Sequence, residues 1–406
     1  MMQTVQGHEK IVLAGLLTAD NDARLFEEDM SEMRLLAATA GASVVAQVVQ
    51  KRTAPTASTY MGPGKLEEIK GIMRQNHATT LIIDAALSPG QVRNIEEIVE
   101  GKIIDRGQLI LDIFAKHART NEARVQVELA QMRTLYPRLT HAWTHFSQQV
   151  GGIGTTGPGE KQLEVDRRLV QKKISDLEKR LGKIEKERVI QRKGRRNVFR
   201  ATLVGYTNVG KSSLLNGLCR SEVVVEDKLF ATLDTSTRRS FIPGAGPIVI
   251  SDTVGFLRKL PLHLVASFRS TLSVAAESNL LLVVMDASSN WIDQQHETVK
   301  SVLTTLGAET VPQLLILNKA DLVTDPFVRK RLSINYPDAL FVSAFSRDDL
   351  RTLKERIAAA VQTFEREERM EEIIRRKTKR IKGEEKTRSA TLVPAEGLLP
   401  PLISDR

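Results

Sequence analysis

Short apolar runs alternate with helix-like patterns over the first 105 residues. The apolar runs are IVLAGLL (11–17), SVVAQVV (43–49), TLIID (80–84) and KIID (102–105). Helical patterns fill the intervals, one from about Asp22 to Ala40, one from Gly64 and one after Pro89. Alternation of this kind predicts a small parallel sheet covered by helices.

A different period begins at Val125, where apolar residues recur at alternating steps of four and three, the spacing of a coiled-coil seam. The first seam comprises Val125, Leu129, Met132, Tyr136, Leu139, Trp143 and Phe146, and the second comprises Val170, Ile174, Leu177, Leu181 and Ile184. Between them lies GGIGTTGPGEK (151–161), which contains five glycines. Two seams joined by one loop predict an antiparallel helical hairpin with a glycine-rich tip. Pro137 is expected to bend its first helix.

From Phe199 the pattern becomes a regular series of strands and helices. The expected strands are ATLVGY (201–206), SFI (240–242), IVISDT (248–253), LLLVVMDA (280–287), QLLILNKA (313–320) and ALFVSA (339–344). The clearest helices are expected at 262–275, 291–306 and 348–365. This series predicts a doubly wound α/β sheet.

The chain has 406 residues, which is too long for one ordinary hydrophobic core. We expect four parts: an α/β domain (1–115), the helical hairpin (116–196), a second α/β domain (197–365) and a charged tail (366–406). The tail is low in aromatic residues, and we expect a helix that fades into a mobile segment.

Composition limits the classes of function. The single cysteine, Cys219, allows no internal disulfide, which fits a reducing compartment. No apolar run is long enough to span a membrane, and the first 20 residues lack a signal-peptide pattern, so we expect a cytoplasmic protein. The net charge is +10, and residues 172–200 hold twelve Lys or Arg against four Asp or Glu, a local net charge of +8. Such a concentrated basic segment indicates a polyanionic partner.

The segment GYTNVGKS (205–212) fits the pattern GxxxxGK[ST] and lies between an apolar strand and a helix, as a phosphate-binding loop requires. Gly205 and Gly210 permit the turn whose amides surround phosphates. Lys211 is expected to meet the β- and γ-phosphates, and the Ser212 hydroxyl to bind Mg²⁺.

Three later segments, in the expected order, indicate guanine. DTVGF (252–256) follows an apolar strand, so Asp252 can hold Mg²⁺ through water and Gly255 can offer its amide to the γ-phosphate. In NKAD (318–321), Asp321 can accept both N1–H and N2–H of guanine, a donor pair that adenine lacks. The amides of VSA (342–344) can reach the guanine O6. The predicted ligand is therefore GTP or GDP.

Three positions bear on hydrolysis. The segment LFATLDTSTRR (229–239) is expected to supply a threonine that binds Mg²⁺ when the γ-phosphate is present; Thr232 is the first choice, and Thr235 and Thr237 are alternatives. Phe256 stands where Ras-like GTPases place the glutamine that orients water. Either turnover is slow, or another group or a monovalent cation replaces the glutamine. Asn208 either helps to hold K⁺ or only shapes the loop.

The order of the parts, together with GGIGTTGPGEKQLEVDRR, GYTNVGKSSLLNGL, LFATLDTSTRR, DTVGFLRKLP and NKAD, resembles the HflX family of translation-factor-related GTPases over about residues 10–365. The resemblance implies a P-loop GTPase domain preceded by a small parallel α/β domain and the long helical hairpin. It further implies binding to the large ribosomal subunit and GTP-dependent splitting of stalled or idle ribosomes. We expect the chain to be a monomer. The glycine tip would enter a narrow RNA-lined site, and the basic hairpin would neutralise phosphates.

These patterns predict four sets of site residues. The catalytic set is Lys211, Thr232, Gly255 and Asn208, and the metal ligands are Ser212, Thr232 and Asp252. The nucleotide-binding set is Gly205, Tyr206, Thr207, Asn208, Val209, Gly210, Lys211, Ser212, Ser213, Phe230, Ala231, Thr232, Asp252, Thr253, Val254, Gly255, Asn318, Lys319, Asp321, Ser343 and Ala344. The RNA-contacting set is Gly151, Gly152, Gly154, Gly157, Gly159, Lys161, Arg192, Lys193, Arg195 and Arg196.

A second hypothesis assigns the same residues a different role, in which the chain is a nucleotide-switched RNA-binding or ribosome assembly factor with little turnover. The two hypotheses differ in whether ribosomes stimulate hydrolysis. An ATP-driven RNA enzyme is disfavoured, because NKAD selects guanine.

Overall fold

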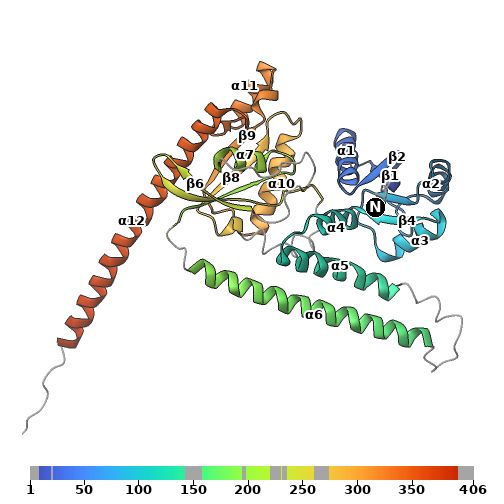
Figure 1. Cartoon of the computed structure of the whole chain (residues 1–406), viewed down its shortest axis with the longest axis horizontal. Coiled ribbons are helices and arrows are strands. Elements are labelled where there is room, and N and C mark those ends of the chain that lie inside the picture. The colour runs from blue at the N-terminus through green and yellow to red at the C-terminus, as the bar shows by residue number, and fades with distance from the viewer. Residues whose placement is uncertain are drawn as a thin grey trace, which may run out of the picture.

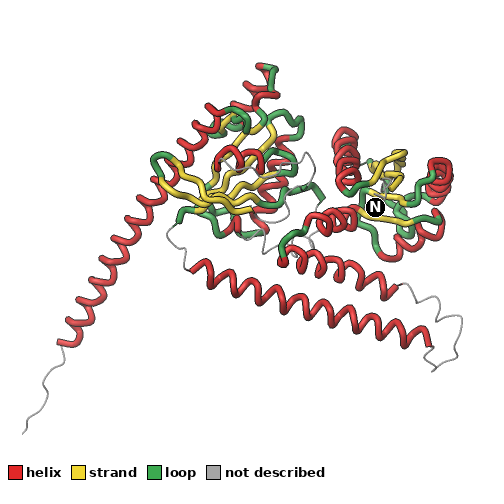
Figure 2. The backbone as a smooth tube through the Cα atoms, in the orientation of Figure 1, coloured by secondary structure: helices red, strands yellow, loops and turns green. Residues whose placement is uncertain are grey.

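The computed structural model describes residues 9–19, 22–141, 158–193, 198–219, 230, 236–259 and 274–391. Its strands form two separate sheets, and long helices run beside them (Figure 1). Figure 2 shows these sheets in yellow, each bordered by helices in red. Among the described helices, none combines the length and the apolar character needed to cross a membrane.

The N-terminal sheet is fully parallel, which confirms the predicted small α/β domain. Its order is β2 (Ala42–Arg52), β1 (Glu9–Thr18), β3 (Thr80–Ile83) and β4 (Lys102–Asp105). Because side chains alternate along a strand, Ile11 and Leu13 pack in one core and Val12 and Ala14 in another. Helices α1 (Ala23–Thr39) and α4 (Arg106–His117) contribute to the first core, and α2 (Pro63–Asn76) and α3 (Pro89–Val99) to the second.

Polar residues cap three of these helices. Asp22 accepts a hydrogen bond from the Arg24 amide at 2.8 Å at the start of α1. Ser88 and Gln91 form a reciprocal capping box at the start of α3. Asp105 accepts from the Gln108 amide at 2.7 Å and so begins α4, a helix that the apolar pattern did not reveal.

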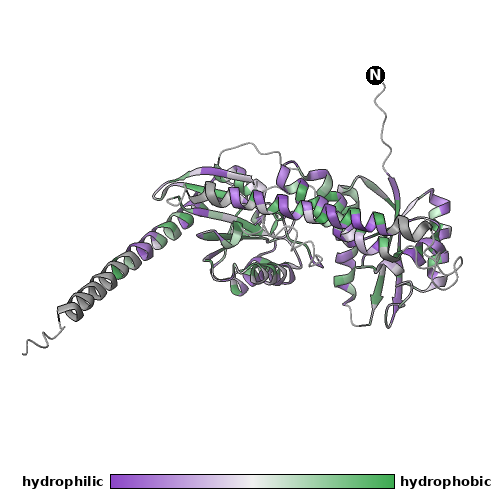
Figure 3. Cartoon of the chain, turned by 90° about the horizontal axis from the view of Figure 1, so that it is seen from below, coloured by the Kyte–Doolittle hydropathy of each residue, from purple (hydrophilic) through white to green (hydrophobic). Residues whose placement is uncertain are grey.

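Helices α5 (Asn121–His141) and α6 (Pro158–Lys193) lie side by side and antiparallel. Lys173 Nζ lies 2.9 Å from Glu128 Oε1, and Arg167 Nε donates to Tyr136 Oη at 2.9 Å. Later residues of α5 therefore pair with earlier residues of α6, as in an antiparallel pair. Predicted seam residues meet between the helices: Val125, Leu129 and Leu177 are buried, with Met132, Ile174 and Leu181 packed around them. Figure 3 shows hydrophilic (purple) and hydrophobic (green) positions alternating along the pair.

One detail of the predicted tip is wrong. The glycine loop was expected to include residues 158–161, but Pro158 begins α6 and Gly159 and Lys161 lie in its first turns. Proline is favourable at the first helical position, because its φ is already helical and its missing amide has no partner there. Residues 142–157, with Trp143 and Phe146 of the predicted seam, lie outside the described residues.

The second sheet has six strands, which confirms the predicted α/β class. Its order is β10 (Leu340–Phe341), β9 (Gln313–Asn318), β8 (Leu280–Asp286), β5 (Arg200–Gly205), β7 (Gly246–Asp252) and β6 (Ser236–Ile242). All neighbours are parallel except the edge strand β6, which pairs antiparallel with β7. The carboxyl ends of β5, β7 and β9 therefore meet at one edge of the sheet.

Helices pack on this sheet in two groups. Helix α7 (Lys211–Cys219) contacts α12 (Arg347–Thr391) so closely that a Cβ on Gly217 would lie 2.7 Å from Leu350 Cδ1. Ile292 of α10 (Ile292–Thr305) and Leu332 of α11 (Pro326–Asn335) share a separate buried cluster with Met285 and Leu317. The expected helix at 262–275 lies largely outside the described residues.

The helix expected at 348–365 does not end at residue 365, because α12 continues as one helix of 45 residues. Its distal part projects away from the sheet (Figure 1). Glu, Arg and Lys, which favour helices, dominate this segment. Their helix propensity explains why α12 continues beyond the part whose hydrophobic face packs on α7. Residues 392–406 lie outside the described residues.

Candidate nucleotide-binding site

The phosphate loop connects β5 to α7, and two of its glycines are sterically required. Gly205 has a φ of 155°, and a Cβ there would lie 2.2 Å from the Val284 carbonyl oxygen. Gly210 has a φ of 89°, and a Cβ there would lie 2.3 Å from Asn318 Nδ2. Any side chain at either position would collide with the neighbouring strand or with the base-side loop.

Lys211 begins α7 with its amine enclosed by the phosphate loop. Its Nζ donates to the carbonyl oxygen of Tyr206 at 2.8 Å and lies 3.3 Å from that of Gly205. Burial lowers the pKa of Lys211 to about 8, while the charge of Asp252 opposes the shift. The loop thus holds a buried cation whose charge only a bound anion would fully stabilise.

Ser212 and Asp252 meet beside this amine. The Ser212 hydroxyl donates to Asp252 Oδ2 at 2.6 Å. Asp252 ends β7 and is 1% exposed, so its position is fixed by the sheet. A hydroxyl and a carboxylate are hard oxygen ligands of the type that Mg²⁺ prefers, so the pair fits that ion.

The segment after Asp252 is bound to the phosphate loop through its backbone. The Phe256 amide donates to the Gly205 carbonyl at 3.0 Å, and the Thr207 amide donates to the Phe256 carbonyl at 2.8 Å. Gly255 lies so close that a Cβ on it would be 2.7 Å from Thr207 Cα and 3.0 Å from Lys211 Nζ. The predicted γ-phosphate-sensing glycine therefore lies directly beside the amine that is predicted to bind phosphate.

Asn318 connects the phosphate loop to the base-side loops. Its Nδ2 donates to the Val209 carbonyl at 2.7 Å, and its Oδ1 accepts from the Ala344 amide at 3.2 Å. Lys319 Nζ pairs with Asp286 Oδ2 at 2.7 Å. Asp321 lies in the short 3₁₀ turn η1 (Ala320–Leu322) with its side chain exposed, where a ligand can reach it.

Ser343 and Ala344 follow β10. The Ser343 amide donates to Asp349 Oδ2 at 2.8 Å, so this amide of the VSA segment is engaged by its own chain. Asn208 has a φ of 60° and is exposed at the turn of the phosphate loop. Asparagine tolerates this left-handed conformation better than most residues, which is consistent with a loop-shaping role.

Several predicted residues lie elsewhere. Phe230 was predicted to bind nucleotide, but its side chain is buried and packs edge-to-face on Phe114 of α4, with ring centroids 4.6 Å apart. An apolar ring gains more from burial there than beside phosphates. Thr237, an alternative metal ligand, lies in β6 with its hydroxyl 3.0 Å from Ser251 Oγ. Arg192 and Lys193 end α6. Gly151, Gly152, Gly154, Gly157, Arg195, Arg196, Ala231, Thr232 and Thr235 lie outside the described residues.

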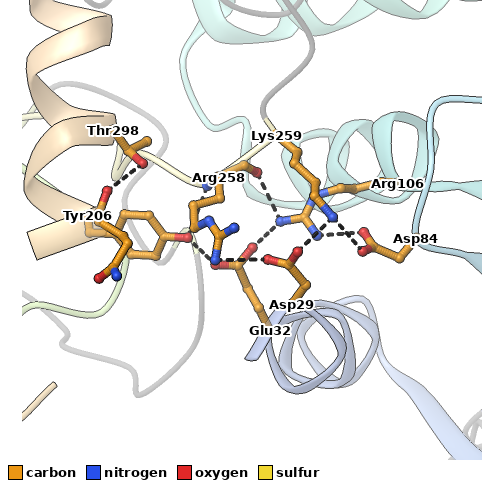
Figure 4. Close-up of polar contacts among 9 residues, drawn as sticks. Asp29, Glu32, Asp84, Arg106, Tyr206, Arg258, Lys259 and Thr298 are labelled. Atoms are coloured by element: carbon orange, nitrogen blue, oxygen red, sulfur yellow. Dashed lines mark hydrogen bonds and ion pairs between the residues drawn. The ribbon is translucent and has the colours of Figure 1, made fainter. Parts of the chain in front are cut away.

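The structure also contains an interdomain cluster of ionic groups that the sequence analysis missed (Figure 4). Asp29 and Glu32 come from α1, Asp84 follows β3, and Arg106 begins α4. The remaining two members, Arg258 and Lys259, follow Phe256 in the second domain. We refer to Asp29, Glu32, Asp84, Arg106, Arg258 and Lys259 as the interdomain cluster.

Arg106 is the central residue of this cluster and is 2% exposed. Its Nη1 lies 2.8 Å from Asp84 Oδ1, and its Nη2 contacts Glu32. Although burial lowers the pKa of Arg106, the carboxylates of Glu32 and Asp84 raise it above its ordinary value. The guanidinium is therefore held charged between two buried acids.

Glu28 at the edge of this cluster predicts a pH dependence of stability. Burial raises the pKa of Glu28 from 4.5 to about 7; Arg258 opposes the rise, and Glu32 and Asp29 add to it. Between these pH values the unfolded chain binds fewer protons at this site, so stability falls as pH rises from about 5 to 7. Because Glu28 is partly exposed, we expect Glu28→Gln to remove about 1 to 2 kcal/mol of that fall. Chemical unfolding at pH 5.5 and 8.0 measures it, and identical pH profiles for the two proteins would exclude the effect.

A phosphate loop between the first strand and helix of a doubly wound sheet, with guanine-selecting residues after a later strand, is the arrangement of a P-loop GTPase. Family models match three consecutive segments: "GTP-binding GTPase N-terminal" at residues 27–115, "GTP-binding GTPase Middle Region" at 117–195 and "50S ribosome-binding GTPase" at 200–319.

Curated relatives match most of the chain. GTPase HflX of Flavobacterium psychrophilum is 40% identical over 374 residues, covering 87% of this chain and 90% of the relative. GTPase HflX of Escherichia coli is 42% identical over 341 residues, covering 83% and 79%. A crystal structure of a GTP-binding protein from Sulfolobus solfataricus in complex with GDP is 26% identical and covers 87% of this chain and 99% of its own, with a TM-score of 0.44. This chain belongs to the HflX family of GTPases and hydrolyses GTP to GDP and phosphate.

Proposed function

We propose that this GTPase binds the large ribosomal subunit and uses GTP to split stalled or idle ribosomes. The observation that carries the proposal is the basic surface of α6, beside α5 and close to the nucleotide domain. Its exposed cationic residues include Lys172, Lys173, Lys179, Arg180, Lys183 and Lys186. Ribosomal RNA is the polyanion that the description of the matching family model, a 50S ribosome-binding GTPase, suggests.

The phosphate loop would hold the phosphates through its backbone amides, with Lys211 neutralising the β- and γ-phosphates. Ser212 and Asp252 would hold Mg²⁺, Asp252 through water, and Thr232 would join them when the γ-phosphate is present. The ion would neutralise charge on the phosphate oxygens during hydrolysis. The 2.6 Å contact between the Ser212 hydroxyl and the Asp252 carboxylate supports this assignment, because the two oxygen groups are already close enough to bind one ion.

Guanine would be selected by Asp321, which is exposed in η1 and able to accept from N1–H and N2–H. Asn318 would keep the base-side loops in place through its bonds to Val209 and Ala344. The stem of Lys319 would cover the base plane.

Water activation requires a group other than Phe256. Phe256 is 1% exposed and its ring cannot hydrogen-bond to water. We propose that unstimulated turnover is slow and that ribosome contact supplies the missing function. Asn208 is exposed beside the loop and is the candidate ligand for K⁺.

The glycine-rich segment between α5 and α6 would approach RNA through its backbone. Gly151, Gly152, Gly154 and Gly157 would form this contact, while Gly159, Lys161, Arg192, Lys193, Arg195 and Arg196 would contact RNA along and beyond α6. The structural support is that α5 and α6 pack against each other as an antiparallel pair. The end of α5 and the start of α6, which the segment connects, therefore lie at the same end of the pair.

Hydrolysis rates test the proposal directly. We expect slow turnover alone and a rise of on the order of tenfold or more with large subunits, because electrostatic completion of a catalytic site typically contributes at least that much. Equal turnover with and without large subunits would contradict it and would favour a switch that acts without stimulated hydrolysis.

The basic surface of α6 gives a second prediction. Replacing Lys179, Arg180 and Lys183 with Gln should weaken binding to large subunits and reduce the slope of log K against log salt by about 2 to 3, if each contacts one phosphate. The matched control replaces three exposed cations elsewhere, Lys300, Lys330 and Arg351, with Gln. Cosedimentation at several salt concentrations is the measurement. A slope that falls equally in both triple variants would show that only net charge matters.

A further inference from the structure

The interdomain cluster has balanced charge only when both domains contribute. The N-terminal domain supplies three carboxylates but one cation, Arg106. Arg258 and Lys259 from the nucleotide domain complete it: Arg258 Nη1 lies 3.2 Å from Asp29 Oδ1, and Lys259 Nζ lies 2.7 Å from Asp29 Oδ2 and 3.1 Å from Asp84 Oδ2. Because Asp29 and Asp84 are buried, withdrawal of the two cations would leave uncompensated buried charge.

The same two residues follow the γ-phosphate-sensing segment (252–256), with only Leu257 in between. Gly255 lies beside Lys211. The backbone amide and carbonyl of Phe256 both form hydrogen bonds with the phosphate loop. A displacement of Gly255 toward a γ-phosphate must therefore be absorbed by Phe256 and Leu257 or passed to the cluster. Arg106 restrains those residues as well, because its Nη2 donates to the Arg258 carbonyl at 3.0 Å.

Tyr206 joins the phosphate loop, this segment and the N-terminal domain at a single hydroxyl. The hydroxyl accepts from the Arg258 amide at 3.0 Å and donates to Glu32 (Figure 4). Tyr206 is 6% exposed, so water does not replace these partners readily. Its backbone belongs to the phosphate loop, but its side chain is directed to the other domain.

A second contact between the two domains involves α4 of the N-terminal domain. Phe230 lies two residues before Thr232, the predicted γ-phosphate-dependent threonine, and packs on Phe114 of α4. Arg106 begins that helix. The segment with Phe230 and the segment after Gly255 are both expected to move with the γ-phosphate. The first contacts α4 through Phe114, and the second contacts it through Arg106.

We propose that Tyr206 is a positioning residue that links the γ-phosphate side of the nucleotide site to the N-terminal domain. With the cluster closed, Tyr206 and Glu32 hold the segment after Gly255 against the phosphate loop and so oppose binding of a γ-phosphate. By reciprocity, GTP loosens the domain contact and GDP leaves it closed. The inference rests on the GTPase activity and not on ribosome binding.

Equilibrium binding of GDP and of guanylyl imidodiphosphate to the full chain, without ribosomes, tests this link. Glu32→Gln and Tyr206→Phe should each tighten binding of the analogue relative to GDP by about 5- to 10-fold, the range of ordinary allosteric coupling. Because the two residues act through one contact, the double variant should show the shift of a single variant and not the product of two.

The matched control is Tyr336→Phe, which removes another tyrosine–carboxylate bond, from Tyr336 to Asp293 at 2.5 Å, within the nucleotide domain. It should leave the ratio of the two affinities unchanged. Unchanged ratios in folded Glu32→Gln and Tyr206→Phe proteins would overturn the proposal.

Hydrogen exchange on the unaltered chain provides an independent measurement should either variant fail to fold. Amides of α1 and of Arg258 should exchange faster with the analogue bound than with GDP bound. Equal exchange in the two states would overturn the link. Neither experiment includes ribosomes, so failure here leaves the proposed function intact, and failure of the ribosome assays leaves the link intact.

Discussion

Lys211→Met will greatly slow GTP hydrolysis without weakening the fold. The amine is buried among backbone carbonyls, and burial already lowers its pKa to about 8, so the charge is costly before nucleotide binds. A methionine of similar length removes this cost and fills the same space. Hydrolysis loses a cation aimed at the β- and γ-phosphates, for which we expect a drop of about 10²- to 10³-fold.

Single-turnover hydrolysis and thermal unfolding of the nucleotide-free chain together test this prediction. The midpoint of unfolding should stay the same or rise, whereas turnover falls. Lys300→Met, on an exposed surface of α10, is the matched control and should change neither. A variant that retains more than about a tenth of wild-type turnover would show that Lys211 does not stabilise the transition state as argued.

Asp321→Asn will change the nucleotide preference from guanine toward xanthine. A carboxylate accepts from both N1–H and N2–H of guanine, and each charge-assisted bond contributes about 1.5 to 3 kcal/mol. Loss of this pair should weaken GTP binding by about 100-fold or more. An asparagine amide can instead donate to the xanthine O2 and accept from N1–H, so xanthosine triphosphate should bind better to the variant than to the wild type.

Competition binding with the two nucleotides is the measurement. The control is Asp325→Asn, four residues later, where the side chain caps α11 by accepting from the Phe327 amide at 2.8 Å and asparagine can do the same. If Asp321→Asn weakens both nucleotides equally, Asp321 supports the loop and does not contact the base.

The parallel core of the fold was predictable because its strands are buried on both faces. β8 is a continuous apolar run from Leu280 to Met285, which is typical of a central parallel strand. Two helices were missed for local reasons. Helix α4 is apolar on most of its surface, so its period is obscured, and α11 is short and is marked mainly by Asp325 and Pro326 at its start.

The nucleotide site was predictable because its residues follow one another in short segments with fixed spacing. Gly205 to Ser212 form one loop. Asp252 and Asn318 each end an apolar strand, so the topology of a parallel sheet places both residues beside this loop. Burial of the Phe230 side chain against Phe114 was not predictable, because the two residues belong to different domains and lie far apart in the chain.

The interdomain cluster was not predictable, because its partners are far apart in the chain. Tyr206 and Glu32 are separated by 174 residues, and Lys259 and Asp84 by 175. A single sequence does not show which of 49 acidic residues a given arginine will meet. The excess of carboxylates over cations around α1 becomes meaningful only when the fold brings Arg258 and Lys259 to them.

We propose that GTP binding lets this protein separate ribosomal subunits. Sedimentation of intact ribosomes incubated with the full chain tests it most directly, with guanylyl imidodiphosphate or GDP in parallel samples. We expect ribosomes to dissociate into subunits with the analogue, with the protein bound to the large subunit, and to remain intact with GDP. Intact ribosomes in both samples, or equal splitting in both, would contradict it.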